Sequence, residues 1–140
     1  MLTQSILNLK QFIKRTMGTW GIGIKDNDTA SDVYADLISL LESNSIEQAM
    51  EKLTVFYQSK INSYEEQNNF WLAVASAQMD TNSLQTDIFD RVQKIILSGE
   101  DLVLWQELKA SETDLNLRKE ALNEFLILLT EYKKQLAKGI

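Results

Sequence analysis

Four aspartates close together near the start of the chain are the residues best suited to chemistry: Asp26, Asp28, Asp32 and Asp36. Asp32 and Asp36 are four positions apart and therefore share one side of a helix, which suits a paired acid and base or a magnesium site. The chain has no histidine and no cysteine, which excludes imidazole bases, thiolate nucleophiles and the usual zinc ligands. A cation-dependent enzyme that uses the Asp26 to Asp36 cluster is one hypothesis.

Two ligand-binding loop motifs do not fit the same stretch. A calcium loop of the helix-loop-helix type needs an oxygen ligand, a glycine and a glutamate at its fifth, sixth and twelfth positions. Counted from Asp26, these positions hold Ala30, Ser31 and Leu37. A dinucleotide fingerprint needs a third glycine where Asp26 stands. We therefore expect no cofactor here.

Helix capping explains the aspartates without any reaction. We expect Asp28 to cap a helix that begins directly after it, because its side-chain oxygen can accept hydrogen bonds from the exposed backbone N–H groups. Asp32 then lies in the first turn, near the positive end of the helix dipole. This interpretation predicts no catalytic residue and no bound metal.

The aspartates stand in MGTWGIGIKDNDTASDV, residues 17–33, which we interpret as an irregular lead-in to the helices. Glycine permits positive φ and a close backbone approach at Gly21 and Gly23. The indole of Trp20 can fill a large hole beneath the helices. Trp71 and Trp105 are assigned to the core for the same reason.

The spacing of apolar residues predicts an all-α fold, a single bundle of six or seven helices behind the glycine-rich lead-in. The first expected helices cover residues 2–15 and about 28–43, and a third runs from a Ser45–Gln48 capping box to Lys60. The next two contain NNFWLAVASAQM (68–79) and Ile88–Ile96. A short helix with Leu102, Trp105 and Leu108 and a long last helix complete the bundle. NNFWLAVASAQM is apolar on most sides and should be central. Gly99 should end the Ile88–Ile96 helix in a left-handed conformation.

The last helix carries a regular apolar seam. Its members recur at steps of seven, three and four: Leu115, Leu122, Phe125, Leu129, Tyr132 and Leu136. Such a seam either packs into the core or joins two chains. A structural or regulatory homodimer assembled through the C-terminal helix is therefore a second hypothesis.

Charge is unevenly distributed along the chain. Residues 1–16 hold Lys10, Lys14 and Arg15 without any acid, and form an amphipathic helix or an extension ahead of a single acidic helical domain over 17–140. Residues 26–114 hold 17 acids and 5 bases, a net charge of −12. Such a field repels nucleic acid and favours a basic protein partner. No apolar run is long enough to span a membrane, and we expect a cytoplasmic protein.

Three blocks of sequence together resemble an uncharacterised bacterial family of small proteins of unknown function. They are MGTWGIG with DNDTASDV, then FWLAVASAQ, then SGEDLVLW, and the resemblance covers roughly residues 17–107. Lys25 departs from the family pattern, which usually has phenylalanine there. The resemblance implies no activity and no catalytic residues, but it suggests kinship with small proteins found among bacterial toxin-immunity and defence gene sets.

These observations favour a non-catalytic binding protein, an immunity-type neutraliser of a basic toxin domain. An immunity protein covers a toxin's working surface, which requires complementary charge rather than a reactive centre. The candidate contacts are acids expected at the surface: Asp36, Glu65, Glu66, Asp87 and Asp90. The alternative role for each is an ordinary solvated side chain.

Overall fold

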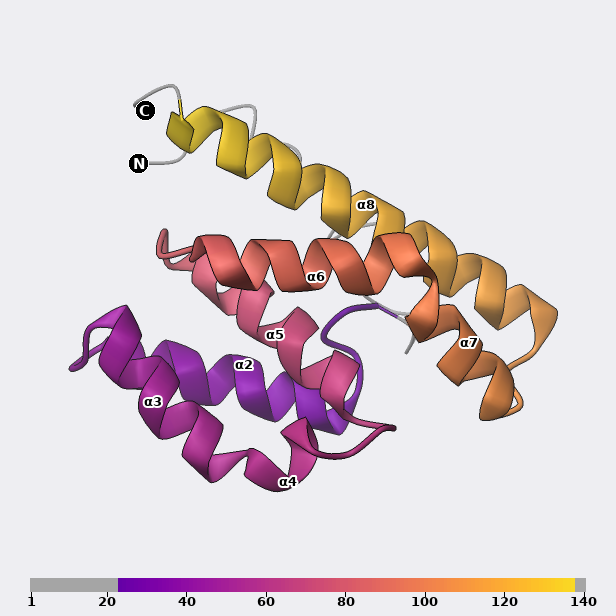
Figure 1. Cartoon of the computed structure of the whole chain (residues 1–140), viewed down its shortest axis with the longest axis horizontal. Coiled ribbons are helices and arrows are strands. Elements are labelled where there is room, and N and C mark those ends of the chain that lie inside the picture. Colours follow the sequence, from indigo (N-terminus) through magenta and orange to yellow (C-terminus); the bar gives the residue numbers. More distant parts are fainter. Residues whose placement is uncertain (1–22, 138–140) are drawn as a thin grey trace.

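Helices account for most of residues 23–137, the part of the chain that this computed structural model describes. The seven helices of this part are α2 (Asp28–Leu41), α3 (Ile46–Phe56), α4 (Gln58–Ile61), α5 (Gln67–Asp80), α6 (Thr86–Ser98), α7 (Glu100–Glu107) and α8 (Glu112–Ala137) (Figure 1). No strand occurs among them, so the all-α prediction is confirmed for these residues. The expected helix over 2–15, together with Trp20 and Gly21, lies outside the described residues.

Helix α5 forms the centre of the core, as the sequence predicts. Every residue from Leu72 to Met79 is buried. The small side chains of Ala73, Ala75 and Ala77 allow neighbouring helices to approach closely. Helix α2 packs on one side of α5 and α6 on the other (Figure 1). A helix buried all round has no amphipathic pattern, and α5 shows none.

The start of α2 differs from the prediction by one residue. Asn27, with extended backbone, is the N-cap, and its side-chain oxygen accepts a 2.8 Å hydrogen bond from the Ala30 N–H. Asp28 is already the first helical residue, so the expectation that Asp28 caps the helix is wrong. Its carboxylate instead lies in the first turn, where the dipole favours negative charge. Asparagine and aspartate are equally good caps, so spacing alone could not choose between neighbours.

Helix α3 begins as predicted and ends early. Ser45 and Gln48 form the expected capping box, with hydrogen bonds in both directions. The helix stops at Phe56 rather than at Lys60, because Tyr57 leaves helical geometry and a short new helix, α4, follows. This break turns the ring of Tyr57 into the core against Phe70, with 5.9 Å between ring centroids.

Gly99 ends α6 in the left-handed region, at φ 78°, as the sequence predicts. The chain then enters α7 directly. The short predicted helix is present, and Leu102 packs partly buried against the core. Leu104, which the prediction did not name, is the most buried apolar side chain of α7. Trp105 is half-buried, and Leu108, the C-cap, is exposed.

Helix α8 has 26 residues and is therefore about 39 Å long at 1.5 Å per residue. It packs on α6 and α7 along one side (Figure 1). The centre of the predicted seam is buried within the chain itself: Leu122, Phe125, Leu129 and Tyr132. These four side chains are therefore not available to a second chain. No helix within residues 23–137 has both the length and the apolar character needed to cross a membrane.

Candidate functional site

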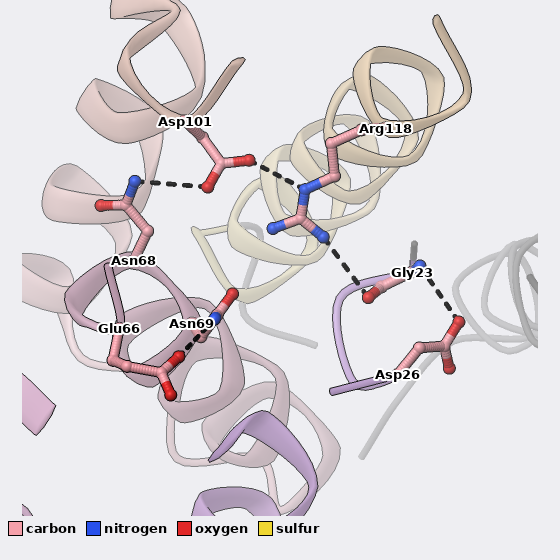
Figure 2. A network of polar contacts seen from close by, with 7 residues as sticks. All are labelled: Gly23, Asp26, Glu66, Asn68, Asn69, Asp101 and Arg118. Carbon is pink, nitrogen blue, oxygen red and sulfur yellow. Dashed lines mark hydrogen bonds and ion pairs between the residues drawn. The ribbon is translucent and has the colours of Figure 1, made fainter. Parts of the chain in front are cut away.

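A buried ion pair joins α7 to α8. The Arg118 guanidinium donates from Nε to Oδ2 of Asp101 at 2.8 Å, and the two side chains are 0% and 1% exposed. Asn68 of α5 donates to the other carboxylate oxygen, Oδ1, at 3.2 Å (Figure 2). The guanidinium carbon of Arg118 lies over the Trp105 ring, 4.9 Å from the ring centroid. The charges compensate one another, so this interior network can hold three helices together.

The same arginine holds the end of the glycine-rich stretch. Its Nη1 donates to the Gly23 carbonyl at 3.4 Å. Asp26 closes a turn on that residue, because its carboxylate accepts from the Gly23 N–H at 3.0 Å and its own N–H donates back to the Gly23 carbonyl at 3.2 Å (Figure 2). Asp26 is thus used in a local turn, and Gly23 is anchored through both of its backbone polar groups.

The sequence analysis missed both Arg118 and Asp101. A signal for Arg118 was available, because it lies four positions before Leu122 and so occupies a core position of the α8 seam. A charge at such a position indicates a buried partner of opposite charge. Nothing in the spacing identifies Asp101 as that partner, since it belongs to another helix.

The remaining aspartates of the proposed cluster line one exposed side of α2. Asp28, Asp32 and Asp36 follow one another at intervals of four and are all exposed. Within residues 23–137, no three side chains of the metal-binding types aspartate, glutamate, histidine and cysteine come close enough to hold an ion. Asp28, Asp32 and Asp36 therefore form a row of charges along the helix and do not converge on one point.

Asp36, the first predicted partner contact, also has a role within the chain. Its carboxylate accepts a hydrogen bond from the hydroxyl of the buried Tyr57. Burial, followed by this hydrogen bond and the negative charges of Asp36 and Asp32, raises the pKa of Tyr57 far above its ordinary value. The hydroxyl therefore stays protonated and keeps donating.

Glu65 and Glu66, two further predicted contacts, differ in their surroundings. Glu65 is exposed, whereas Glu66 accepts from the Thr29 hydroxyl at 2.7 Å and from Asn69 at 2.9 Å. Lys60 lies 3.5 Å from the Glu66 carboxylate. Desolvation alone raises the pKa of Glu66, but the hydrogen bonds and Lys60 outweigh it, and the pKa lies below its ordinary 4.5. Glu66 thus fastens the start of α2 to the start of α5.

Asp87 and Asp90, the last two predicted contacts, are exposed on α6. Helix α6 packs on α5, and α5 packs on α2, the helix that carries Asp36 (Figure 1). The five predicted contacts therefore come from three separate parts of the chain: α2, the connection before α5, and α6.

Tyrosine hydroxyls connect distant elements throughout the described residues. All four tyrosines donate to a side-chain oxygen elsewhere in the fold: Tyr34 to Asp80, Tyr57 to Asp36, Tyr64 to Glu107 and Tyr132 to Asn82. At the first pair, Lys25 lies 4.1 Å from the Tyr34 ring centroid and 3.9 Å from the Asp80 carboxylate. Lys25 thus packs its charged end on an aromatic face.

The two described tryptophans lie half-buried beside arginines. Trp71 packs against the hydrophobic core, edge-on to Phe70 with 4.8 Å between ring centroids, and Arg91 lies 4.2 Å above its ring. Trp105 packs on Arg118 as described above. Each indole therefore contacts an arginine side chain and is neither fully buried nor fully exposed.

The acidic α2–α3 surface is dominated by negative charge, with Lys52 as the one base on the two helices and their connection. We use this name for the exposed acids of the two helices and their connection: Asp28, Asp32, Asp36, Glu42, Glu47 and Glu51. From residue 26 to residue 51 the chain has seven acids and no base. Because α2 and α3 pack side by side (Figure 1), their negative charges add to one field.

Comparison with protein families places most of the chain in a family. A family model described as "Domain of unknown function (DUF4259)" matches residues 18–131. No curated protein and no solved structure matches the chain.

Proposed function

This chain belongs to the DUF4259 family, whose description names no function, and we propose that it is a non-catalytic domain that binds a basic protein. The form that we favour is an immunity-type neutraliser of a basic toxin domain. Such a protein acts by covering the toxin's working surface, and the buried ion pair and tyrosine hydrogen bonds described above suit it as a rigid scaffold for that purpose.

The observation that carries this proposal is the row formed by Asp28, Asp32 and Asp36 on α2. Like charges four positions apart on a helix are destabilising by about 0.2–0.5 kcal/mol per pair. Helix α2 has no lysine or arginine to offset them. Repulsion within the row therefore lowers the stability of the fold. A partner of opposite charge would relieve this repulsion.

The acidic α2–α3 surface can also speed the encounter with a basic partner by electrostatic steering. A patch of one sign increases the rate at which a partner of opposite sign is encountered, and added salt reduces that increase. We expect the association rate with a basic toxin domain to fall steeply as ionic strength rises. The dissociation rate should change less, because it depends on the packed contact.

Co-expression with a basic toxin domain encoded by a neighbouring gene tests the proposal. We expect the wild-type chain to restore growth and the Asp32→Asn/Asp36→Asn variant to restore it less well. Asp87→Asn/Asp90→Asn is the matched control, because it removes the same charge from α6. Undiminished toxicity with the wild-type chain would contradict the proposed function. An equal loss of growth with the two variants would mean that the net charge of the protein, rather than the acidic α2–α3 surface, is responsible for protection.

A further inference from the structure

Two adjacent apolar side chains lie open to water at the end of α3. Val55 is 73% exposed and Phe56 is 77% exposed, the highest values for large apolar side chains within residues 23–137. Scattered apolar residues are normal at a surface, but a neighbouring pair that includes an aromatic ring is typical of an interaction site. Helix α3 packs on α2 and α4 only through its other side, where Ala49 and Leu53 are buried.

Carboxylates lie beside the tyrosine against which Phe56 packs. The Phe56 ring stands edge-on to the Tyr57 ring, with 5.1 Å between centroids. The Tyr57 hydroxyl in turn donates to Asp36, and Asp32 lies one helical turn before Asp36. An aromatic anchor with acids at its edge is complementary to an apolar side chain flanked by lysine or arginine.

The bases nearest in sequence are engaged elsewhere. Lys52 donates to Asn44, at the opposite end of α3, at 2.9 Å. Lys60 lies 3.5 Å from Glu66. The last turn of α3 contains no base, so the negative end of its dipole adds to the charge around Phe56.

We propose that Val55 and Phe56 of α3, together with Asp32 and Asp36 of the neighbouring helix α2, form a docking site for a basic amphipathic helix of the partner protein. This inference rests on the proposed function and names the surface and the chemistry of the partner. The apolar face of the docked helix covers Val55 and Phe56, and its lysines or arginines meet Asp32 and Asp36.

Charge favours a basic helix of a partner protein over a second copy of this chain at the docking site. A symmetric pair formed through the same patch would bring Asp32 and Asp36 of one copy towards those of the other, which is repulsive. Residues 2–15 of the chain have a sequence of the favoured type, with leucines and isoleucines at helical spacing beside Lys10 and Lys14. They are therefore the competitor that the experiment must separate from a partner.

A fluorescent synthetic peptide provides the probe. It carries leucines at helical spacing with lysines on the flanks, and its binding to the full 140-residue protein is followed by fluorescence anisotropy. We expect Phe56→Ser to weaken binding about tenfold, the loss typical of a buried anchor. Asp32→Asn/Asp36→Asn should weaken binding and reduce its dependence on salt. Leu97→Ser, which changes a side chain 68% exposed on α6, and Asp87→Asn/Asp90→Asn should leave binding unchanged.

Folding of Phe56→Ser and Leu97→Ser is checked by their melting temperatures, which should equal that of the wild type because both side chains are mostly exposed. Unchanged affinity in Phe56→Ser would overturn the proposal. So would equal weakening in Asp87→Asn/Asp90→Asn. Tighter binding by Lys10→Ala/Lys14→Ala/Arg15→Ala would also overturn it, because the chain's own first residues would then compete for the patch. A dimer in sedimentation that Phe56→Ser abolishes would identify a second copy as the occupant instead.

The toxin co-expression assay separates this inference from the proposed function. If the wild-type chain and Phe56→Ser protect equally, the function stands and the docking site is wrong. If neither protects while the peptide still binds in a Phe56-dependent way, the patch stands and the toxin-neutralising function is wrong.

Discussion

Arg118 on α8 donates a hydrogen bond to the backbone carbonyl of Gly23, a residue 95 positions earlier in the chain. The same guanidinium pairs with Asp101 on α7. One buried side chain thus joins the end of the glycine-rich stretch to the last two helices. It also explains why a charged residue is accommodated in the core, since each polar neighbour offsets part of the cost of removing arginine from water.

The first prediction concerns this ion pair. Arg118→Ala should reduce the free energy of unfolding by about 3–5 kcal/mol, because it leaves Asp101 charged and buried without its partner. Arg118→Met/Asp101→Asn should recover much of that loss, since the double variant removes both charges and keeps an acceptor for Asn68. Urea denaturation measures the free energy of unfolding of both variants.

Lys119→Ala is the control for that series, because Lys119 is exposed on α8 beside Arg118. It should change stability by less than about 0.5 kcal/mol. A comparable loss in Lys119→Ala and Arg118→Ala would mean that the helix, and not the buried pair, determines the effect.

The second prediction distinguishes the two candidate caps of α2. Asn27→Ala should cost about 1 kcal/mol, because it removes the acceptor of the Ala30 N–H. Asp28→Ala should cost less, since the favourable dipole interaction that it loses is offset by relief of repulsion from Asp32. Thermal and urea unfolding of the two variants give the comparison. A larger loss in Asp28→Ala would restore Asp28 as the cap.

The third prediction is a pH dependence of stability. The pKa of Glu66 lies below its ordinary 4.5 in the folded chain, so its contribution to stability is complete above pH 4.5 and is lost as the pH falls through the folded pKa. Glu66→Gln should therefore flatten the decline of unfolding free energy on the acid side of pH 4.5. Glu65→Gln, at the exposed neighbouring position, should leave the decline unchanged. An identical profile in Glu66→Gln and wild type would refute the assignment.

The fourth prediction concerns the hypothesis of a cation-dependent enzyme. Because Asp28, Asp32 and Asp36 lie along a helix side rather than around a point, millimolar magnesium, manganese or calcium should not raise the melting temperature beyond the effect of equal ionic strength. Differential scanning fluorimetry with sodium chloride as the ionic-strength control makes the measurement. A cation-specific increase that Asp32→Asn/Asp36→Asn removes would revive the enzyme hypothesis.

Local pattern predicted most of the helical architecture, although it missed the break at Tyr57 between α3 and α4. The spacing of apolar residues identified α5 as the central helix, the Ser45–Gln48 box identified the start of α3, and Gly99 identified the end of α6. Each of these features depends on residues within a few positions of one another, where helix periodicity and backbone hydrogen bonding operate. The one-residue error at Asn27 arose where two equally good caps are neighbours.

Contacts between residues distant in sequence required the tertiary structure. Spacing within a helix reveals which side is apolar, but it does not identify which side chain on another helix will face it. For that reason the sequence alone left open whether the α8 seam packs inside the chain, where its centre proves to be buried, or joins two chains. The pairing of Arg118 with Asp101 was likewise decided only by how the helices pack.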